Sequence, residues 1–215
     1  MANMTTPIPE KTIERLSEYR RTLLKCHAQG ITHIFSHVLA GMHGITAVQV
    51  RRDLMLIGFS SDTKKGYDVK VLIDFIDDIL YSEQPMNMAV IGMGHLGQAV
   101  TKYFNGKGLK LRITAAFDIH PDKVGTLIDN IPCYHIDEFE ERVDELNISI
   151  VIVSSPTSVA STLLLPIINA GIKGVLNFTS APLNFPPGIV VENYDITTLM
   201  EKVAYFVKVA EESSN

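Results

Sequence analysis

Residues 86–97 read MNMAVIGMGHLG, and this stretch decides the fold of the larger part of the chain. The first six residues are mostly apolar, a pattern typical of a short strand that is buried on both faces. Gly92, Gly94 and Gly97 follow at once with the spacing G-x-G-x-x-G, and a helical pattern then runs through Tyr103. A strand, this spacing and a helix in succession predict a dinucleotide-binding turn.

Each glycine of the motif has its own physical reason. Gly92 permits the tight turn, Gly94 lets a pyrophosphate approach the backbone, and Gly97 lets the helix pack closely on the strand. Asp118 ends the next predicted strand, where a carboxylate accepts hydrogen bonds from ribose hydroxyls and repels a 2′-phosphate. No Arg follows among residues 119–121. The pattern predicts an NAD(H) site, and the alternative is a structural turn without a ligand.

Alternating strands and helices continue beyond this motif. A helix is predicted over residues 160–170, and strands are predicted over residues 111–117, 148–153, 173–178 and 189–192. Such alternation implies a parallel sheet with helices on both faces, so we expect an α/β domain with the doubly wound Rossmann fold. The polar residues 82–85 mark its beginning, and the domain is predicted over residues 86–194.

Residues 1–82 have a helical pattern instead. Helices are predicted over residues 11–28, 36–42, 46–57 and 71–80, with two short strands around a polar turn over residues 59–69. Ser36 is placed to cap the second helix, and Thr46 with Gln49 fits a capping box at the start of the third. This order of elements predicts a winged helix-turn-helix domain. A helical interaction domain with a solvated basic face is the alternative.

Charge is unevenly distributed along the chain. The whole chain has a formal net charge of −5, yet residues 1–70 carry ten Lys and Arg against six Asp and Glu. Because a local excess of positive charge sets the affinity for phosphates, this region is predicted to bind double-stranded DNA, unless the asymmetry arose by chance. The predicted DNA contacts are Ser36, Thr46, Gln49, Arg51 and Arg52 on the helices and Lys64 and Lys65 at the tip of the wing.

Cysteine usage and hydropathy predict the cellular compartment. Cys26 and Cys133 are too few for a disulfide framework or for a metal-ligand pattern, which indicates a reducing compartment. The chain does not begin with a basic segment followed by an apolar run, and no stretch reaches the roughly 18 apolar residues of a membrane span. We therefore expect a cytoplasmic protein with no membrane partner.

Signatures of catalysis are poor. There is no G-x-S-x-G elbow and no Ser-His-Asp signature. His33 and His37 have the spacing of two metal ligands on a helix, but they lack an obvious further ligand. We predict no catalytic residue and no metal site. A basic head joined to a dinucleotide pocket without catalytic groups indicates a sensor.

The sequence resembles the Rex family of redox-sensing transcriptional repressors over essentially the whole chain. The resemblance is carried by residues 15–21 (RLSEYRR), 48–54 (VQVRRDL), 66–69 (GYDV), 92–97 (GMGHLG), 117–121 (FDIHP) and 170–178 (AGIKGVLNF). It implies a homodimer that binds operator DNA when free or bound to NAD⁺ and releases the DNA when NADH binds. It further implies that Arg21, Tyr103 and Asp195 link the cofactor domain to the first helix of the DNA domain as a switch.

The resemblance also extends the predicted cofactor site beyond the glycine motif. The predicted NAD(H) contacts are Gly92, Met93, Gly94, His95, Leu96, Gly97, Asp118, Ser155, Pro156, Asn177 and Phe178. The chain departs from the family pattern at Thr63, where the family wing commonly carries an Arg, and at Thr179 near the predicted nicotinamide end. These departures leave the operator preference and the relative affinity for NADH and NAD⁺ open.

Residues 195–215 are predicted as a C-terminal dimerisation helix. Apolar residues wrap more than one face of the helix over residues 196–212, so it needs more than one neighbour. Asp195 is placed to cap this helix. The resemblance implies a domain-swapped helix that is exchanged between two subunits, whereas packing against its own sheet is the alternative. A small NAD-dependent oxidoreductase with an accessory helical domain, or a CoA-binding protein on the same fold, are the remaining alternatives for the function.

Overall fold

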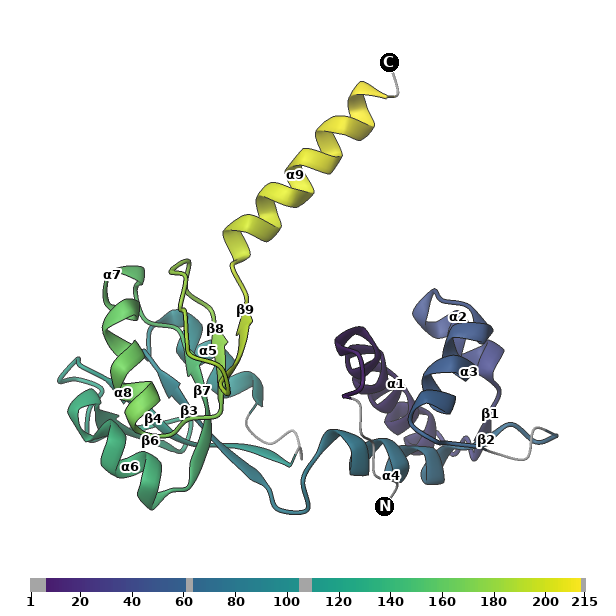
Figure 1. The fold of residues 1–215 in the computed structure, drawn as a ribbon, viewed down its shortest axis with the longest axis horizontal. Helices are drawn as coiled ribbons and strands as arrows, with labels where there is room; N and C mark the ends of the chain where they lie inside the picture. The colour runs from purple at the N-terminus through teal and green to yellow at the C-terminus, as the bar shows by residue number, and fades with distance from the viewer. Residues whose placement is uncertain (1–6, 61–63, 105–109, 214–215) are drawn as a thin grey trace. The chain divides into compact units, whose positions relative to one another are not determined.

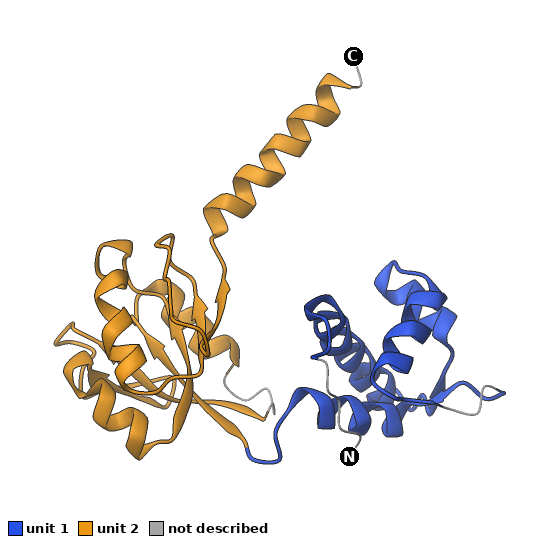
Figure 2. Ribbon diagram, in the orientation of Figure 1, with its two compact units in different colours: residues 1–84 blue, residues 85–215 orange. Residues whose placement is uncertain are grey.

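The computed structural model describes residues 7–60, 64–104 and 110–213. The chain divides into two compact units, Met1–Gln84 and Pro85–Asn215, which Figure 2 shows in different colours. Figure 1 labels the helices and strands of both units.

Unit 1 is a small helical domain with one short sheet. Its elements are α1 (Glu10–Ala28), β1 (His33–Ile34), α2 (Ser36–His43), α3 (Ala47–Leu56), β2 (Tyr67–Asp68) and α4 (Val69–Leu80). The predicted apolar spacing of α1 is confirmed, because Leu16, Tyr19 and Leu23 are completely buried. They pack with residues of α2, α3 and α4 in a single core, which fixes α3 against the rest of the unit.

In the hairpin predicted over residues 59–69, the first strand is wrong at Phe59 and Ser60, which form no strand, while residues 61–63 lie outside the described residues. β2 pairs instead with β1, with Ile34 opposite Tyr67 in an antiparallel register. Phe59 is outside any strand and packs its ring edge-on against Tyr67 at 6.0 Å between centroids. Gly66 has a φ of +82°, and a Cβ there would lie 2.7 Å from the carbonyl oxygen of Ile34. The close approach of the two chain segments therefore requires glycine.

The two predicted N-caps of unit 1 have different outcomes. The Thr46 hydroxyl accepts a hydrogen bond of 3.1 Å from the backbone N–H of Gln49, which confirms this cap of α3. Ser36 is the first residue of α2 rather than its cap, and its hydroxyl accepts a hydrogen bond from Arg51. The second half of the predicted capping box is also wrong, because the Gln49 side chain bonds Asp53 instead of turning back to Thr46.

Within the described residues, unit 2 contains a seven-stranded sheet with the strand order β5-β6-β4-β3-β7-β8-β9. Its elements are β3 (Met86–Ile91), α5 (His95–Phe104), β4 (Leu111–Asp118), β5 (Leu127–Ile128), β6 (Ile131–His135), η1 (Ile136–Glu138), α6 (Phe139–Glu145), β7 (Ile148–Val153), α7 (Thr157–Ala160), η2 (Ser161–Leu163), α8 (Leu164–Asn169), β8 (Gly174–Asn177), β9 (Val190–Asn193) and α9 (Ile196–Glu212). All strands except β5 run parallel. Numbered along the chain, the parallel strands have the order 3-2-1-4-5-6, which confirms the doubly wound Rossmann fold.

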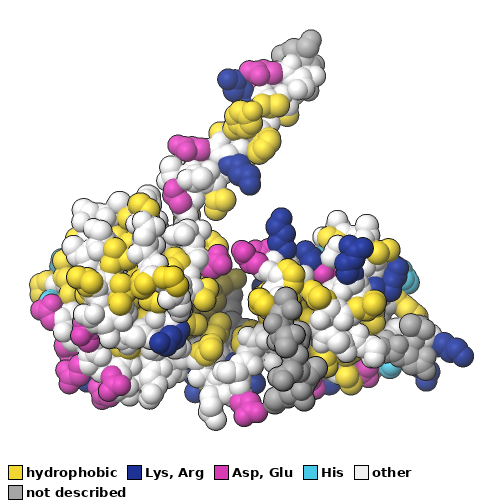
Figure 3. Space-filling view, in the orientation of Figure 1, with side chains coloured by type: hydrophobic (Ala, Val, Ile, Leu, Met, Phe, Trp, Pro, Cys, Tyr) yellow, Lys and Arg dark blue, Asp and Glu magenta, His cyan; other side chains and the backbone are white. Residues whose placement is uncertain are grey.

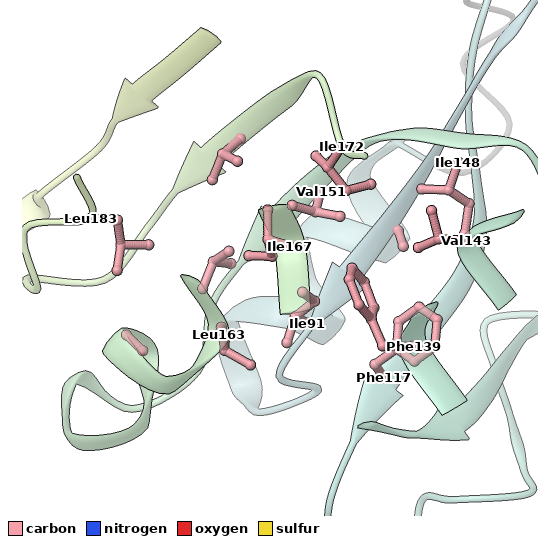
Figure 4. Packing of buried hydrophobic residues seen from close by; sticks show 14 of the residues in the cluster. Ile91, Phe117, Phe139, Val143, Ile148, Val151, Leu163, Ile167, Ile172 and Leu183 are labelled. Atoms are coloured by element: carbon pink, nitrogen blue, oxygen red, sulfur yellow. The ribbon is translucent and has the colours of Figure 1, made fainter. Parts of the chain in front are cut away.

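Both faces of this sheet are covered, as the unbroken apolar runs of its strands predict. Ala89 of β3 belongs to the cluster of residues that includes α6 and α8, whereas the next residue, Val90, belongs to the cluster beneath α5. Figure 4 shows the first cluster, in which Phe117 of β4 lies beside Phe139 of α6. These two rings meet edge to face with their centroids 5.0 Å apart. Packing on both faces holds the strand ends in fixed positions.

The segments from β5 to α6 and the short helix α7 are absent from the expectations drawn from the sequence. β6 extends the sheet beside β4, β5 returns antiparallel to β6, and α6 follows. Asp129 and Asn130 form the turn between β5 and β6 with φ values of +50° and +66°. The strands are too short for a visible period, and Pro132 interrupts the second of them. Short segments of this kind carry too little pattern for a prediction.

No residue of α9 is buried within the chain. Leu199, Val203 and Phe206 expose between 53% and 63% of their surface, and Figure 3 shows hydrophobic side chains along α9 between charged ones. Asp195 caps the helix as predicted, because its carboxylate accepts a hydrogen bond of 3.1 Å from the N–H of Thr197. The apolar faces of α9 therefore remain uncovered in a single chain.

Over the part of the chain that the structure describes, no helix combines the length and the hydropathy that a bilayer-spanning segment requires.

Candidate functional site

A cavity of about 1140 Å³ lies in unit 2 at the carboxyl ends of the parallel strands. The loop after β3 lines it with Gly92 and Gly94, and the loop after β7 lines it with Ser154 and Ser155. β3 and β7 are neighbours in the sheet but not in the sequence, so this is the point where the strand order reverses. Ligands of doubly wound sheets bind at such a point, and the volume suffices for a ligand larger than a typical drug.

The glycine-rich turn has the geometry that its spacing predicts. Gly92 has a φ of +94°, and a Cβ there would lie 2.7 Å from the backbone nitrogen of Ser155. At Gly97 a Cβ would lie only 2.1 Å from the carbonyl oxygen of Gly92. Gly94 has open space where a Cβ would stand and lines the cavity. The first and third glycines thus allow close packing, and the second leaves the backbone at the start of α5 open to a phosphate.

Asp118 is tied to the glycine-rich turn by its own carboxylate. One oxygen accepts hydrogen bonds of 2.8 and 2.9 Å from the N–H groups of Ile119 and His120. The other oxygen accepts from the N–H of Met93 at 2.8 Å and from Nζ of Lys123 at 2.9 Å. Burial opposes ionisation, but these hydrogen bonds outweigh it and hold the pKa of Asp118 below its ordinary value. The carboxylate is therefore charged and faces the cavity.

Lys123 is a site residue that the motif search missed. Its side chain lines the cavity and forms an ion pair with Asp118, and it lies just beyond residues 119–121, which contain no Arg. A cation beside the carboxylate reduces the repulsion between Asp118 and a 2′-phosphate. The preference for NAD(H) over NADP(H) therefore stays a prediction.

The predicted cofactor residues divide into two groups. The cavity is lined by Gly92, Gly94, His95, Leu96, Asp118, Ser155, Pro156 and Phe178, whereas Met93, Gly97 and Asn177 are outside its lining. Asn177 is almost completely buried, and its amide nitrogen donates to the carbonyl oxygen of Ala181 and to the side chain of Asn193. Its hydrogen bond to Ala181 therefore holds the loop after β8 in place without contact with the cavity.

The hydroxyl oxygen of Ser155 is buried and has no hydrogen-bond partner among the described residues. A buried polar group without a partner is costly, and a ligand in the cavity would remove that cost by pairing with it. The charged Asp118 at one part of the lining and this hydroxyl at another fit a ligand with several separated polar groups. A dinucleotide is such a ligand.

The cavity wall continues to the start of α9. Phe178 lines the cavity and stacks on Tyr194, with the centroids 5.1 Å apart and the rings inclined by 20°. Hydrogen bonds from Thr198, and then from Thr197 and Ser180, hold the pKa of the Asp195 carboxyl below its ordinary value. Contacts within unit 2 therefore join the cavity wall to the residues that begin α9.

The other two predicted switch residues are on the surface of their units. Tyr103, near the end of α5, is 61% exposed and packs edge-on against Phe104. Arg21 of α1 is exposed and donates a hydrogen bond to Ser17. Their common role stays a prediction.

The basic residues predicted to contact DNA are exposed in unit 1. Arg51 and Arg52 lie on α3, and Lys64 and Lys65 lie just before β2. Figure 3 shows dark-blue Lys and Arg side chains over this unit. Thr63, the departure in the wing, lies outside the described residues. No group of three His, Cys, Asp or Glu that could hold a metal ion occurs among the described residues.

A buried polar network behind α3 is the second feature that the motif search missed. Asp53 of α3 is only 2% exposed and forms an ion pair of 2.7 Å with Arg15 of α1. It also accepts hydrogen bonds from the hydroxyl of Tyr19 at 2.8 Å and from the side-chain amide of Gln49 at 2.9 Å. Burial opposes the charge of Asp53, but its hydrogen bonds, led by that of Arg15, outweigh burial and lower its pKa.

This lowered pKa predicts a pH-dependent stability of unit 1. Above the unfolded pKa of about 3.9 the ion pair contributes fully, and its contribution is lost as the pH falls through the folded pKa. We expect Asp53→Asn to lower the free energy of unfolding by about 3 kcal/mol at pH 7, because it breaks a buried pair, and by less in acid. Urea denaturation of both proteins at pH 7 and pH 3 measures this difference.

The matched control for that experiment is Asp74→Asn, which breaks the exposed Lys70–Asp74 pair on α4. An exposed pair of this kind contributes less than about 1 kcal/mol. Equal costs of Asp53→Asn at both pH values would show that the charge of Asp53 does not stabilise the fold.

Each of the two units matches a known family model over part of its length. Residues 83–181 match the family model described as "CoA binding domain", and residues 7–54 match the one described as "Putative DNA-binding protein N-terminus". The chain is 34% identical to "Redox-sensing transcriptional repressor Rex" of Listeria welshimeri over 97% of each chain. It is 36% identical to the protein of that name from Geobacillus kaustophilus, again over 97% of each.

Solved structures of a Rex-family repressor called RSP are similar over nearly the full length at 28% identity. The structure of RSP with β-NAD⁺ and operator DNA has a TM-score of 0.89 and covers 98% of this chain and 97% of the other. The structure with β-NADH has a TM-score of 0.83 and covers 98% and 99%. Because sequence identity above 30% spans almost all of both chains in the curated relatives, this chain belongs to the Rex family of redox-sensing transcriptional repressors.

Proposed function

We propose that this chain is a DNA-binding transcriptional repressor that senses the ratio of NADH to NAD⁺. It binds operator DNA when it is free or bound to NAD⁺, and it releases the DNA when NADH binds. Family membership carries this conclusion, together with the similarity of the chain to a repressor solved with operator DNA and NAD⁺ and again with NADH. The relatives are named as transcriptional repressors, so the function is regulation rather than enzymatic catalysis.

NAD(H) binds in the cavity of unit 2. Gly92 and Gly94 are proposed to face the pyrophosphate, Asp118 to accept a ribose hydroxyl, and Ser155, Pro156 and Phe178 to face the nicotinamide. The oxidised ring carries a positive charge that the reduced ring lacks. A sensor needs only that the two forms favour two states of the protein to different degrees.

Residues 1–82 are proposed as the DNA-binding domain, in which α3 enters the major groove. Arg51 and Arg52 are exposed on this helix, and they reach base edges or phosphates together with Gln49, Ser36 and Thr46. Lys64 and Lys65 are exposed and contact the backbone or the minor groove from the wing. We also propose a cytoplasmic location, because a repressor acts where its operator DNA is.

Residues 86–194 form the cofactor domain in this proposal, and residues 195–215 form the dimerisation helix. The exposed apolar faces of α9 support a homodimer in which each subunit covers the helix of the other. Asp195, at the start of α9, is proposed to exchange partners with Tyr103 and Arg21 as the state of the coenzyme changes. This exchange would carry the signal to α1.

A DNA titration with and without NADH tests the function. The probe is a duplex that the NAD⁺-bound protein selects from a random library, followed by fluorescence anisotropy at several salt concentrations. We expect the affinity to fall with salt, as phosphate contacts require, and NADH to raise the Kd at least about tenfold, a coupling of about 1.4 kcal/mol. Asp195→Ala is expected to retain DNA binding and to lose the response to NADH.

Glu201→Ala is the control, because it removes another carboxylate of the same helix that takes no part in the hydrogen bonds of Asp195. NADH that binds without changing DNA occupancy would overturn the proposal. The match to the CoA-binding family model makes CoA a necessary competitor in the same assay. Displacement of NADH by CoA at equal concentration would favour a CoA sensor.

A further inference from the structure

We propose that buried Asp53 fixes the side-chain amide of Gln49 so that its carbonyl oxygen faces the DNA and selects a base with an exposed amino group. The inference rests on the proposed function, because it takes α3 as the helix in the major groove. It adds a positioning residue and a rule of base preference that the exposed side chains alone do not supply.

The carboxylate of Asp53 is fully engaged by donors. Its Oδ1 accepts from Nη2 of Arg15 at 2.7 Å and from Nε2 of Gln49 at 2.9 Å. Its Oδ2 accepts from Nε of Arg15 at 2.7 Å and from the hydroxyl of Tyr19 at 2.8 Å. A carboxylate offers about four acceptor positions, so all of them are occupied. The two-pronged contact from Arg15 fixes the plane of the carboxylate.

An ionised carboxylate only accepts hydrogen bonds, so it determines which end of an amide approaches it. The NH₂ group of Gln49 must face Asp53, and the carbonyl oxygen is left at the other end. Within residues 7–60, 64–104 and 110–213 this oxygen accepts no hydrogen bond, and it is not one of the buried polar atoms that lack a partner. The Gln49 oxygen therefore faces solvent on α3.

The orientation of an amide decides what it recognises in the major groove. Adenine and cytosine present amino groups there, whereas guanine and thymine present acceptor oxygens. An outward carbonyl oxygen pairs with an amino group and repels an acceptor. A free glutamine would turn its terminal amide over with little resistance and accept either kind of base. With its amide held by Asp53, Gln49 is expected to prefer adenine or cytosine on the strand it contacts.

Arg15 and Tyr19 act on this preference through Asp53. Both lie on α1, and Tyr19 is completely buried, so its effect on DNA recognition must be indirect. The Arg20–Asp77 pair offers a comparison, because it also joins an arginine of α1 to an aspartate of another helix, here a partly buried one on α4. The comparison separates the positioning of Gln49 from the general stability of unit 1.

The test uses the full-length NAD⁺-bound protein and a duplex selected from a random library. Gln49→Ala identifies the position in the duplex that this side chain contacts, since only the preference at that position should disappear. Four duplexes that differ only there are then titrated. We expect the wild-type protein to bind the duplexes with adenine or cytosine on one strand at least about fivefold more tightly than those with guanine or thymine.

Arg15→Lys keeps the positive charge but cannot make the two-pronged contact, so the amide is released and the discrimination among the four duplexes should shrink to less than about twofold. Arg20→Lys should keep the full discrimination even where it lowers the melting temperature. Tyr19→Phe removes a single hydroxyl from the network and is expected to reduce the discrimination partly. It provides a second test if Arg15→Lys does not fold.

The inference is overturned if the selected base at that position is guanine or thymine, or if Arg15→Lys and Tyr19→Phe weaken all four duplexes equally. It also fails alone if the wild-type protein selects DNA and releases it with NADH while Gln49→Ala alters no position. A wild-type protein that selects no sequence would overturn the proposed function and this inference together.

Discussion

Replacement of Gly97 with Ala is expected to abolish NADH binding and to lower the free energy of unfolding of unit 2 by about 3 kcal/mol. The added Cβ would lie 2.1 Å from the carbonyl oxygen of Gly92 and 2.9 Å from the hydroxyl of Ser154. That hydroxyl donates a hydrogen bond of 2.8 Å to the same carbonyl. Because backbone atoms cannot give way as a flexible side chain does, α5 and the turn must move apart.

The measurement is a fluorescence titration with NADH beside a urea denaturation curve. Gly94→Ala is the matched control, because no atom lies within 4 Å of the added methyl group. It should unfold like the wild-type protein, and any loss of NADH affinity would then come from contact with the ligand itself. A Gly97→Ala protein with unchanged affinity and stability would show that α5 does not pack closely against the carbonyl oxygen of Gly92.

A charged residue in the middle of α9 is expected to separate the proposed homodimer. In Phe206→Asp, an apolar side chain that is 59% exposed in the single chain is replaced by a carboxylate. Full burial of a Phe is worth about 2–3 kcal/mol, and a two-fold symmetric interface contains it twice. The dissociation constant of the dimer should therefore rise by a factor of about 10³ or more.

Sedimentation equilibrium of the wild-type and variant proteins measures this change. Lys208→Ala alters an exposed, charged residue of the same helix and should leave the dimer intact. Since no residue of α9 is buried within the chain, Phe206→Asp should not lower the stability of the single chain. A wild-type protein that sediments as a monomer at micromolar concentration would refute the dimer.

The sequence predicts those parts of the fold in which residues close together along the chain determine the local structure. Gly92, Gly94 and Gly97 lie within six consecutive residues, so their spacing alone predicts the geometry of the turn between β3 and α5. The buried network of Asp53 could not be predicted from the sequence, because its partners Arg15 and Tyr19 are 38 and 34 residues away. Nothing local distinguishes a buried aspartate on an amphipathic helix from one that faces solvent.

Two errors at unit 1 have the same origin. The first strand of the predicted hairpin was sought next to β2 in sequence, whereas β1 precedes α2 and pairs across the domain. Ser36 has the residue type of an N-cap, but its hydroxyl is held by Arg51 of α3. At the cofactor site, Lys123 reaches Asp118 because the loop after β4 turns back on itself. In the first two cases tertiary contacts decide between locally equivalent choices, whereas the Asp118–Lys123 pair is local and depends on the conformation of one loop.

In the proposed homodimer, the apolar faces of α9 in a newly synthesised chain stay exposed until a second copy covers them. The concentration of complete regulator then grows with the square of the chain concentration while subunits are scarce. Unassembled chains expose α9 to proteases and chaperones, which remove or retain them. A cell would then contain few unassembled subunits, and the concentration of the dimeric repressor would respond steeply to the rate of synthesis.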